Sequence, residues 1–206
     1  MYVSKLNRNE KVEELNEFIR QNSFGMLVSV VNGSAMATHI PMYLSEDGKT
    51  LTGHIARANS QWKNWESSSE VLAVFQGSHA YISSSWYDHE NVPTWNYMAV
   101  HVYGKIRIIE NEELLESLKN LVHKHERSSV KPVSVEGMSE TYVTEQMRGI
   151  VGLEIRISKM EAAYKLSQNR DTKNHANIVS ELEKRGDENS VAIAEQMRKY
   201  GITKKE

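Results

Sequence analysis

Two histidines on neighbouring strands of a predicted hairpin are the first candidates for chemistry in this sequence. If the turn between the strands takes residues 45–48, Leu44 pairs with Lys49 and His39 lies directly opposite His54. The two imidazoles could then bind a metal, form hydrogen bonds in the wall of a barrel, or line a planar cofactor. The two strands offer no Asp, Glu or Cys nearby, so the set of ligands for structural zinc is incomplete.

A candidate site for a phosphate group follows the second of these strands. Arg57 stands at the end of the strand, and Asn59 or Ser60 can cap a short helix predicted over residues 61–67. A guanidinium beside the free N–H groups of a helix start attracts a phosphate dianion, and Lys63 could add a further charge. The alternative is that Arg57 is a solvated residue at the rim of the sheet. The chain contains neither a Walker A sequence nor G-x-G-x-x-G, which disfavours a P-loop or Rossmann nucleotide site.

Aromatic side chains gather in one part of the sequence. All four tryptophans lie within residues 62–95, namely Trp62, Trp65, Trp86 and Trp95. The stretch 77–97 mixes aromatic rings with small hydroxyl residues, so it could provide flat surfaces for stacking a ligand. It could equally form a dimer interface or pack over the core.

Composition limits the class of protein. The chain has 206 residues, no cysteine, and 25 Lys and Arg against 27 Asp and Glu. The absence of cysteine excludes disulfides and thiolate chemistry and is typical of a reducing compartment. No apolar run approaches the roughly 18 residues of a membrane span, and a charged segment stands where a signal peptide has its apolar core. We therefore expect a cytoplasmic protein. A formal charge of −2 disfavours nonspecific coating of nucleic acid.

Hydrophobic periodicity and turn signals predict the elements that position these residues. Asn32-Gly33 is typical of a type I′ hairpin turn, and Gly186 separates two charged helices. The predicted strands are 24–31, 34–44, 49–56, 71–76, 80–83, 98–109 and 150–157. The predicted helices are 10–22, 111–126, 138–148, 174–185 and 188–200.

These elements favour one class of fold. Strands joined mostly by short turns, with helices at the margins, are typical of an antiparallel barrel rather than a doubly wound α/β sheet. We predict a mainly β barrel domain over residues 1–166 and a helical appendage over residues 167–206.

Five linked motifs, in order along the chain, resemble those of the PaiB-type family of FMN-binding-domain transcriptional regulators. They are Ala37-Thr38-His39-Ile40-Pro41, Gly53-His54-Ile55-Ala56-Arg57-Ala58-Asn59-Ser60-Gln61-Trp62, His79-Ala80-Tyr81-Ile82-Ser83, the run from Val92-Pro93-Thr94-Trp95-Asn96-Tyr97 to Ala99-Val100-His101-Val102-Tyr103-Gly104, and Lys165-Leu166-Ser167-Gln168-Asn169. The resemblance extends over nearly the whole chain.

The resemblance implies a split β-barrel, similar to the pyridoxamine-phosphate oxidase and flavin-reductase superfamily, that forms a homodimer with flavin at the subunit interface. It also implies repression of sporulation and degradative-enzyme genes. On this basis we predict FMN contacts of three kinds. The ring would lie against a strand face carrying Thr38, His39, His54 and Ala56, the phosphate would meet Arg57, Asn59 and the N–H groups before Trp62, and Trp86 or Trp95 of the other subunit would cover the ring.

Two questions stay open at this level. The rival class is an enzyme on the same scaffold, either an FMN-dependent reductase or a haem-handling barrel with His39, His54, His79 or His101 as axial ligand. No residue of the chain is identified as a general acid or base, which disfavours an enzyme.

The second question is how a repressor of this kind would reach DNA, because no helix-turn-helix pattern with a basic recognition helix is present. The candidate contacts are local basic patches, which could equally be solvated helix faces. They comprise Lys119, His123, Lys124, His125, Arg127 and Lys131, and then Lys184, Arg185, Arg198, Lys199, Lys204 and Lys205.

Overall fold

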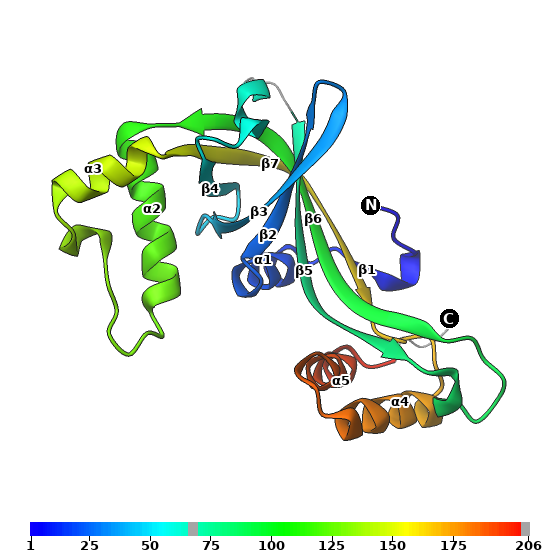
Figure 1. The fold of residues 1–206 in the computed structure, drawn as a ribbon. Coiled ribbons are helices and arrows are strands. Elements are labelled where there is room, and N and C mark those ends of the chain that lie inside the picture. Colours follow the sequence, from blue (N-terminus) through cyan, green and yellow to red (C-terminus); the bar gives the residue numbers. More distant parts are fainter. Residues whose placement is uncertain (66–69, 203–206) are drawn as a thin grey trace. The chain divides into compact units, whose positions relative to one another are not determined.

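A computed structural model describes residues 1–65 and 70–202 of the chain (Figure 1). The chain divides into two compact units. The first, which we call the sheet unit, comprises Asn16–Phe75 and His101–Met160. The second, the helical unit, comprises Met1–Leu15, Gln76–Val100 and the chain from Glu161 onward. The predicted domain boundary at residue 166 stays a prediction.

Antiparallel strands build the sheet unit, in the order β7-β4-β3-β2-β5. These strands are β2 (Phe24–Val31), β3 (Ser34–Leu44), β4 (Thr50–Ala56), β5 (Glu70–Ile82), β6 (Thr94–Ile109) and β7 (Ile150–Lys165). β6 follows β5 in the order and also pairs with β7, so the strand order closes on itself. Gly104 permits this closure, because a Cβ there would lie 2.3 Å from the carbonyl oxygen of Arg156 on β7.

The hairpin of β2 and β3 follows the sequence prediction. Its register runs from Phe24 opposite Pro41 to Val31 opposite Ser34. Asn32 has φ of 50° and Gly33 has φ of 79°, the positive values that a type I′ turn requires. The predicted turn is therefore confirmed.

Two sequence predictions about strands and helices are wrong in detail. The predicted strands 71–76 and 80–83 are one continuous strand, β5, because the polar Gln76-Gly77-Ser78 stretch stays extended. The helix predicted over 61–67 is a short 3₁₀ helix, η2 (Ser60–Asn64), and its last two predicted positions, 66 and 67, lie outside the described residues.

Alternation along the strands places one apolar face in the core of the sheet unit. Leu27, Met42, Leu51, Phe75 and Leu153 are fully buried there. The helix α2 (Asn111–Glu126) contacts β3 and β4 and buries Leu114, Ser117 and Leu121. The shorter helix α3 (Glu140–Arg148) follows the 3₁₀ helix η4 (Val135–Gly137).

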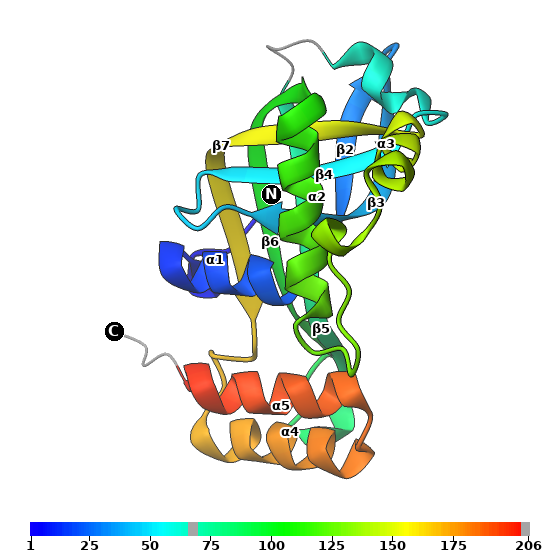
Figure 2. The ribbon, with the colours of Figure 1, turned by 90° about the vertical axis from the view of Figure 1, so that its left-hand side faces the viewer.

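The helical unit contains two neighbouring helices, α4 (Thr172–Arg185) and α5 (Glu188–Tyr200), which lie side by side (Figure 2). Asp171 and Asp187 cap their N-termini, and Gly186 ends α4 in the left-handed conformation with φ of 71°. The predicted pair of helices is therefore confirmed.

The remaining elements are short or lie at the start of the chain. They are η1 (Lys5–Asn7), β1 (Arg8–Asn9), α1 (Val12–Gln21) and η3 (Ser84–Trp86). β1 pairs with Ala162 and Ala163 of β7. Within the described residues, no helix combines the length and the apolar character needed to span a membrane.

Candidate functional site

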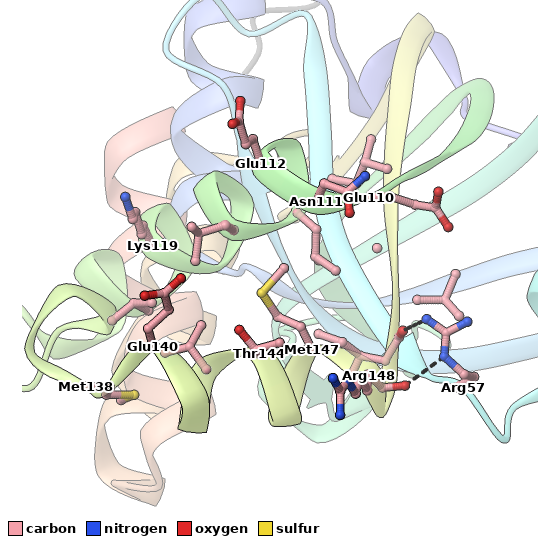
Figure 3. A pocket seen from close by; sticks show the side chains of 18 of the residues that line it. Arg57, Glu110, Asn111, Glu112, Lys119, Met138, Glu140, Thr144, Met147 and Arg148 are labelled. Carbon is pink, nitrogen blue, oxygen red and sulfur yellow. Dashed lines mark hydrogen bonds between the residues drawn. The ribbon is translucent and has the colours of Figure 1, made fainter.

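Arg57 is held firmly where β4 ends. Its backbone N–H donates to the carbonyl of Gly149 at 2.8 Å, and its side chain donates from Nε to Arg148 O at 2.8 Å and from Nη2 to Ile150 O at 2.7 Å (Figure 3). The positive guanidinium thus lies at the C-terminal end of α3, where a cation is favourable. Guanidinium has five N–H donors, and the exposed side chain uses two of them for these carbonyls. The others are available to an anion.

Asn59, Thr38 and Gln61 form a ring of three hydrogen bonds in the segment that follows Arg57. Asn59 Oδ1 accepts from the backbone N–H of Gln61 at 2.9 Å, and Asn59 Nδ2 donates to Thr38 Oγ1 at 2.9 Å. Thr38 Oγ1 donates in turn to Gln61 Oε1 at 2.6 Å. Trp62 Nε1 donates to the carbonyl of Arg57 at 2.9 Å. The segment therefore has a fixed conformation, and the Gln61 N–H is already occupied by a side chain.

Gln61 is a central residue of this region that sequence reasoning missed. Its side chain is fully buried, and Nε2 donates to Leu27 O at 3.3 Å, Ser29 Oγ at 2.9 Å and Met36 O at 3.2 Å. The side chain therefore connects η2 with both strands of the β2–β3 hairpin. The sequence gives no signal for this burial, because glutamine at the start of a short helix is usually exposed.

The register of β3 and β4 corrects the prediction that His39 lies opposite His54. Met42 pairs with Gly53 and Leu44 with Leu51, so the loop between β3 and β4 runs over 45–49 rather than 45–48. Ser45 explains the longer loop. Its N–H donates to Thr50 O at 2.9 Å, and its Oγ accepts from the N–H groups of Lys49 and Thr50.

The predicted flavin face is also divided by the alternation of β3. Thr38 points to the inner side, where it meets Gln61, whereas the next residue, His39, points outward. His39 is exposed and stacks on Phe24, with ring centroids 6.3 Å apart and planes at 26°. One strand face therefore does not carry both Thr38 and His39.

His54 lies on the outer side of β4 in register with Gly152 of β7, and Ala56 is in register with Ile150. Within the described part of the chain, His54 Nδ1 is buried without a hydrogen-bond partner. Burial lowers the pKa of this imidazole below its usual value, because the charged form is desolvated. His54 is thus held neutral at physiological pH.

The two candidate ring-covering tryptophans belong to the helical unit and differ in surroundings. Arg185 lies over the Trp86 ring at 4.8 Å and also donates to the carbonyl of Tyr81 at 3.1 Å. Trp95 is 52% exposed, and its ring lies 6.0 Å from His79 and 5.9 Å from Tyr81. Trp95 therefore offers an accessible aromatic surface, whereas one face of Trp86 is already covered.

A pocket of about 670 Å³ lies within the sheet unit, between α2, α3, η4 and the adjoining ends of β6 and β7 (Figure 3). Its wall is mainly aliphatic and thioether side chains, including Leu114, Val143 and Met147, and Arg57 lies at its edge. Apart from Arg57, the lining residues lie within 108–152. Sequence reasoning missed this pocket because the way in which α3 packs against α2 leaves no pattern in the sequence.

Solved structures similar to this chain define its class of fold. A FAD and heme binding protein from Mycobacterium smegmatis matches with a TM-score of 0.60 and 10% identity, covering 84% of this chain and 80% of that one. The flavocytochrome Anf3 from Azotobacter vinelandii matches with a TM-score of 0.59 and 16% identity, covering 85% and 78%. The fold is a mainly β split barrel with helices, as the sequence predicted.

Sequence similarity then gives the family. Residues 1–159 match the family described as "Putative FMN-binding domain". The chain is 42% identical over 199 residues to "Protease synthase and sporulation protein PAI 2" of Bacillus subtilis (strain 168), covering 96% of each chain. The chain therefore belongs to this FMN-binding-domain family, and the PaiB-type resemblance is confirmed.

Proposed function

We propose that this protein is a cytoplasmic FMN-binding homodimer that negatively regulates sporulation and degradative-enzyme genes. The family match and the name of the Bacillus subtilis relative support the regulatory role and the ligand. The structural observation that carries the proposal is the guanidinium of Arg57, which is exposed yet fixed by two backbone carbonyls. A cation oriented in advance loses little freedom when it binds a phosphate.

The residues around Arg57 fit FMN once the predicted contacts are revised. Arg57 would hold the phosphate, whereas Asn59 would support it indirectly, because both ends of its side-chain amide already bind Gln61 and Thr38. The isoalloxazine ring would lie beside Ala56, the exposed residue next to Arg57, whereas His54 is half-buried on β4. When bound, FMN supplies reversible electron transfer, which would allow a regulator to respond to redox state.

The outer face of the β2–β3–β5 sheet supports the homodimer. Phe24 and Val30 on this face are 65% and 66% exposed. The strand registers place further apolar residues beside them, namely Met26, Val28, Ala35, Ala37, Leu72 and Val74. A contiguous exposed apolar face of this kind marks an interaction surface. A second copy of the chain would cover it, and Trp95 rather than Trp86 would be the ring cover, since Arg185 lies over Trp86.

Charge pairing of four candidate basic residues favours an indirect effect on gene expression over direct DNA contact. Lys119 and His123 lie within ion-pair distance of Glu136, and Lys184 of Glu181. Arg198 pairs with Glu183. A cation that is already paired with a carboxylate must give up that pair before it can neutralise a phosphate and release a counterion from DNA. Such a cation therefore contributes little to DNA affinity. Lys204 and Lys205 lie outside the described residues.

FMN titration tests the flavin part of the proposal. Saturable quenching of flavin fluorescence is expected with the wild-type protein. Arg57→Ala should weaken FMN binding by about 10- to 100-fold, because a hydrogen bond to a charged group is worth roughly 1.5–3 kcal/mol. Lys49→Ala, which removes an exposed cation at the turn before β4, is the control and should change affinity little. Absence of saturable quenching, or equal effects of the two substitutions, would reject the assigned phosphate contact.

A mobility-shift titration against promoter DNA tests the mode of regulation. The indirect mode predicts no specific shift, even at low salt. A sequence-specific shift whose affinity falls as salt rises would instead establish direct phosphate contact and overturn this part of the proposal.

A further inference from the structure

The helix α3 packs unusually loosely for an amphipathic helix. None of its residues is buried, although Val143 and Met147 on its apolar side line the pocket beside α2. The close-up view shows Met147 and Thr144 directed from α3 toward the pocket, opposite the start of α2 (Figure 3). The space that a packed core would fill is therefore a cavity of about 670 Å³. This is the size of a small-molecule site rather than of a protein-binding groove.

The lining of the pocket determines the chemistry of its occupant. Its interior walls carry aliphatic side chains such as Leu114 and Leu115 together with flexible methionine, which adapts to irregular apolar ligands. Lys119 is the half-buried charged residue of the lining, and it already lies within ion-pair distance of Glu136. The other charged lining residues are exposed, namely Arg57, Glu110, Glu112, Glu136, Glu140 and Arg148. An ionised group placed inside would lose its hydration without gaining a buried partner. The pocket thus suits a compact, uncharged apolar molecule.

Arg57 connects this pocket to the phosphate contact proposed above. Its three hydrogen bonds go to the carbonyls of Arg148, Gly149 and Ile150, which end α3 and begin β7. The guanidinium therefore takes its orientation from the C-terminal end of the helix that forms one wall of the pocket. A molecule that packs against Val143 and Met147 would restrict α3 and, with it, the carbonyls that orient Arg57.

We propose that the pocket between α2 and α3 is an effector site for a small uncharged apolar molecule, whose binding strengthens FMN binding through Arg57. The coupling rests on the proposed flavin function, whereas the existence of the site does not. Because coupling between two binding sites is reciprocal, FMN must strengthen binding of the effector by the same factor. Octanol, which is neutral and apolar, serves as the test ligand.

Binding of the neutral dye Nile red to FMN-free protein tests the site itself. The dye should bind saturably with a rise in fluorescence, and octanol should displace it. Val143→Trp, which fills the pocket, should weaken dye binding at least tenfold. Gln146→Trp, on the same helix but outside the pocket lining, should leave it unchanged. Equal dye binding by all three proteins would place the dye on another apolar surface, such as the β2–β3–β5 face, and would overturn the site. Circular dichroism melting shows that each variant is folded.

FMN titration with and without saturating octanol tests the coupling. The expected result is roughly fivefold tighter FMN binding with octanol in wild type and in Gln146→Trp, and no change in Val143→Trp. Unchanged FMN affinity in a wild-type protein whose pocket is saturated would overturn the coupling. If FMN fails to bind under either condition, the flavin function and the coupling are both rejected, while loss of Nile red binding in Val143→Trp but not in Gln146→Trp still establishes the site.

Discussion

The two faces of the β2–β3 hairpin depart in part from the usual arrangement of an antiparallel sheet, which is apolar toward the core and polar toward water. The inner face is mainly apolar, with Leu27 and Met42 fully buried, but it also carries polar side chains. On the inner face, Thr38 and Ser29 bind the fully buried amide of Gln61. On the outer face, the exposed residues are apolar apart from His39, with Phe24 and Val30 each about two thirds exposed. The polar groups of the inner face are therefore hydrogen-bonded in the interior, whereas large apolar side chains of the outer face are uncovered.

This difference indicates that the two faces serve different purposes. The inner network fixes one conformation of the loop that carries Arg57, because each of its polar groups loses a partner if the loop moves. The outer face gains its stabilisation only when another surface covers it. The hairpin thus orders the proposed phosphate contact from one side and presents a proposed dimer surface on the other.

Substitution of Gln61 should have the largest effect on the inner face. Gln61→Leu leaves the carbonyls of Leu27 and Met36 and the hydroxyl of Thr38 without this partner, and each unsatisfied buried group costs about 1–3 kcal/mol. We expect the free energy of unfolding, measured in urea, to fall by about 3 kcal/mol. Lys63→Leu, at an exposed position of the same 3₁₀ helix, is the control and should fall by less than about 0.5 kcal/mol.

An acidic substitution on the outer face should break the dimer and leave the fold intact. Val30→Glu places two like charges at a two-fold interface, and we expect the dimer dissociation constant to rise about 100-fold. Sedimentation equilibrium measures this constant. Lys49→Glu, at the exposed turn before β4, should leave it unchanged. A dimer equally stable in both variants would show that subunits associate through another surface.

Two neighbouring residues of β3 allow a sharper comparison of the inner and outer faces of the hairpin. Thr38→Val removes the hydroxyl that links Asn59 to Gln61 and should lower the free energy of unfolding by about 1–2 kcal/mol. Ala37→Ser, one residue away on the outer face, should lower it by less than about 0.5 kcal/mol. Urea unfolding compares the two, and similar losses would mean that the faces do not differ as described.

The sequence predicted the fold well and the site less completely. Turn chemistry at Asn32-Gly33 and the alternation of β2 and β3 are local signals, so they were readable without a structure. The register of β3 and β4 was missed, because Ser45 closes a longer loop through hydrogen bonds that spacing does not reveal.

The candidate phosphate site around Arg57 was likewise only partly predictable from local sequence signals. Arg57 was identified from its position at a strand end, but its bonds to the end of α3 join residues about 90 positions apart in sequence. Burial of Gln61 and the pocket beside α3 likewise depend on long-range packing. By contrast, successive side chains of a strand point to opposite faces of the sheet, so the sequence alone already places Thr38 and His39 on different faces of β3.

The smallest expected effect concerns His54, whose pKa in the folded state lies below the value of about 6.5 in an unfolded chain. The unfolded state therefore binds a proton more readily, and the free energy of unfolding should fall as pH drops through about 6.5. We expect a contribution of about 1 kcal/mol or less between pH 7.5 and 5.5, reduced in His54→Asn.

His175 of α4 must be separated from this effect, because burial lowers its pKa in the same direction. Urea unfolding of His54→Asn, His175→Asn and the double variant at both pH values separates the two contributions. NMR titration of the His54 ring gives its pKa directly, and a value at or above 6.5 would contradict the neutral state.

Sedimentation velocity recorded at the visible absorption band of flavin reports FMN binding and dimer assembly in one experiment, so it tests the proposed FMN-binding homodimer as a whole. With FMN present, we expect flavin to sediment with wild-type protein at the mass of a dimer. In Arg57→Ala the dimer should persist while the flavin stays free, and in Val30→Glu the protein should sediment as a monomer with little flavin. Flavin that sediments with a wild-type monomer, or a wild-type dimer that carries no flavin, would rule out the proposed FMN-binding homodimer.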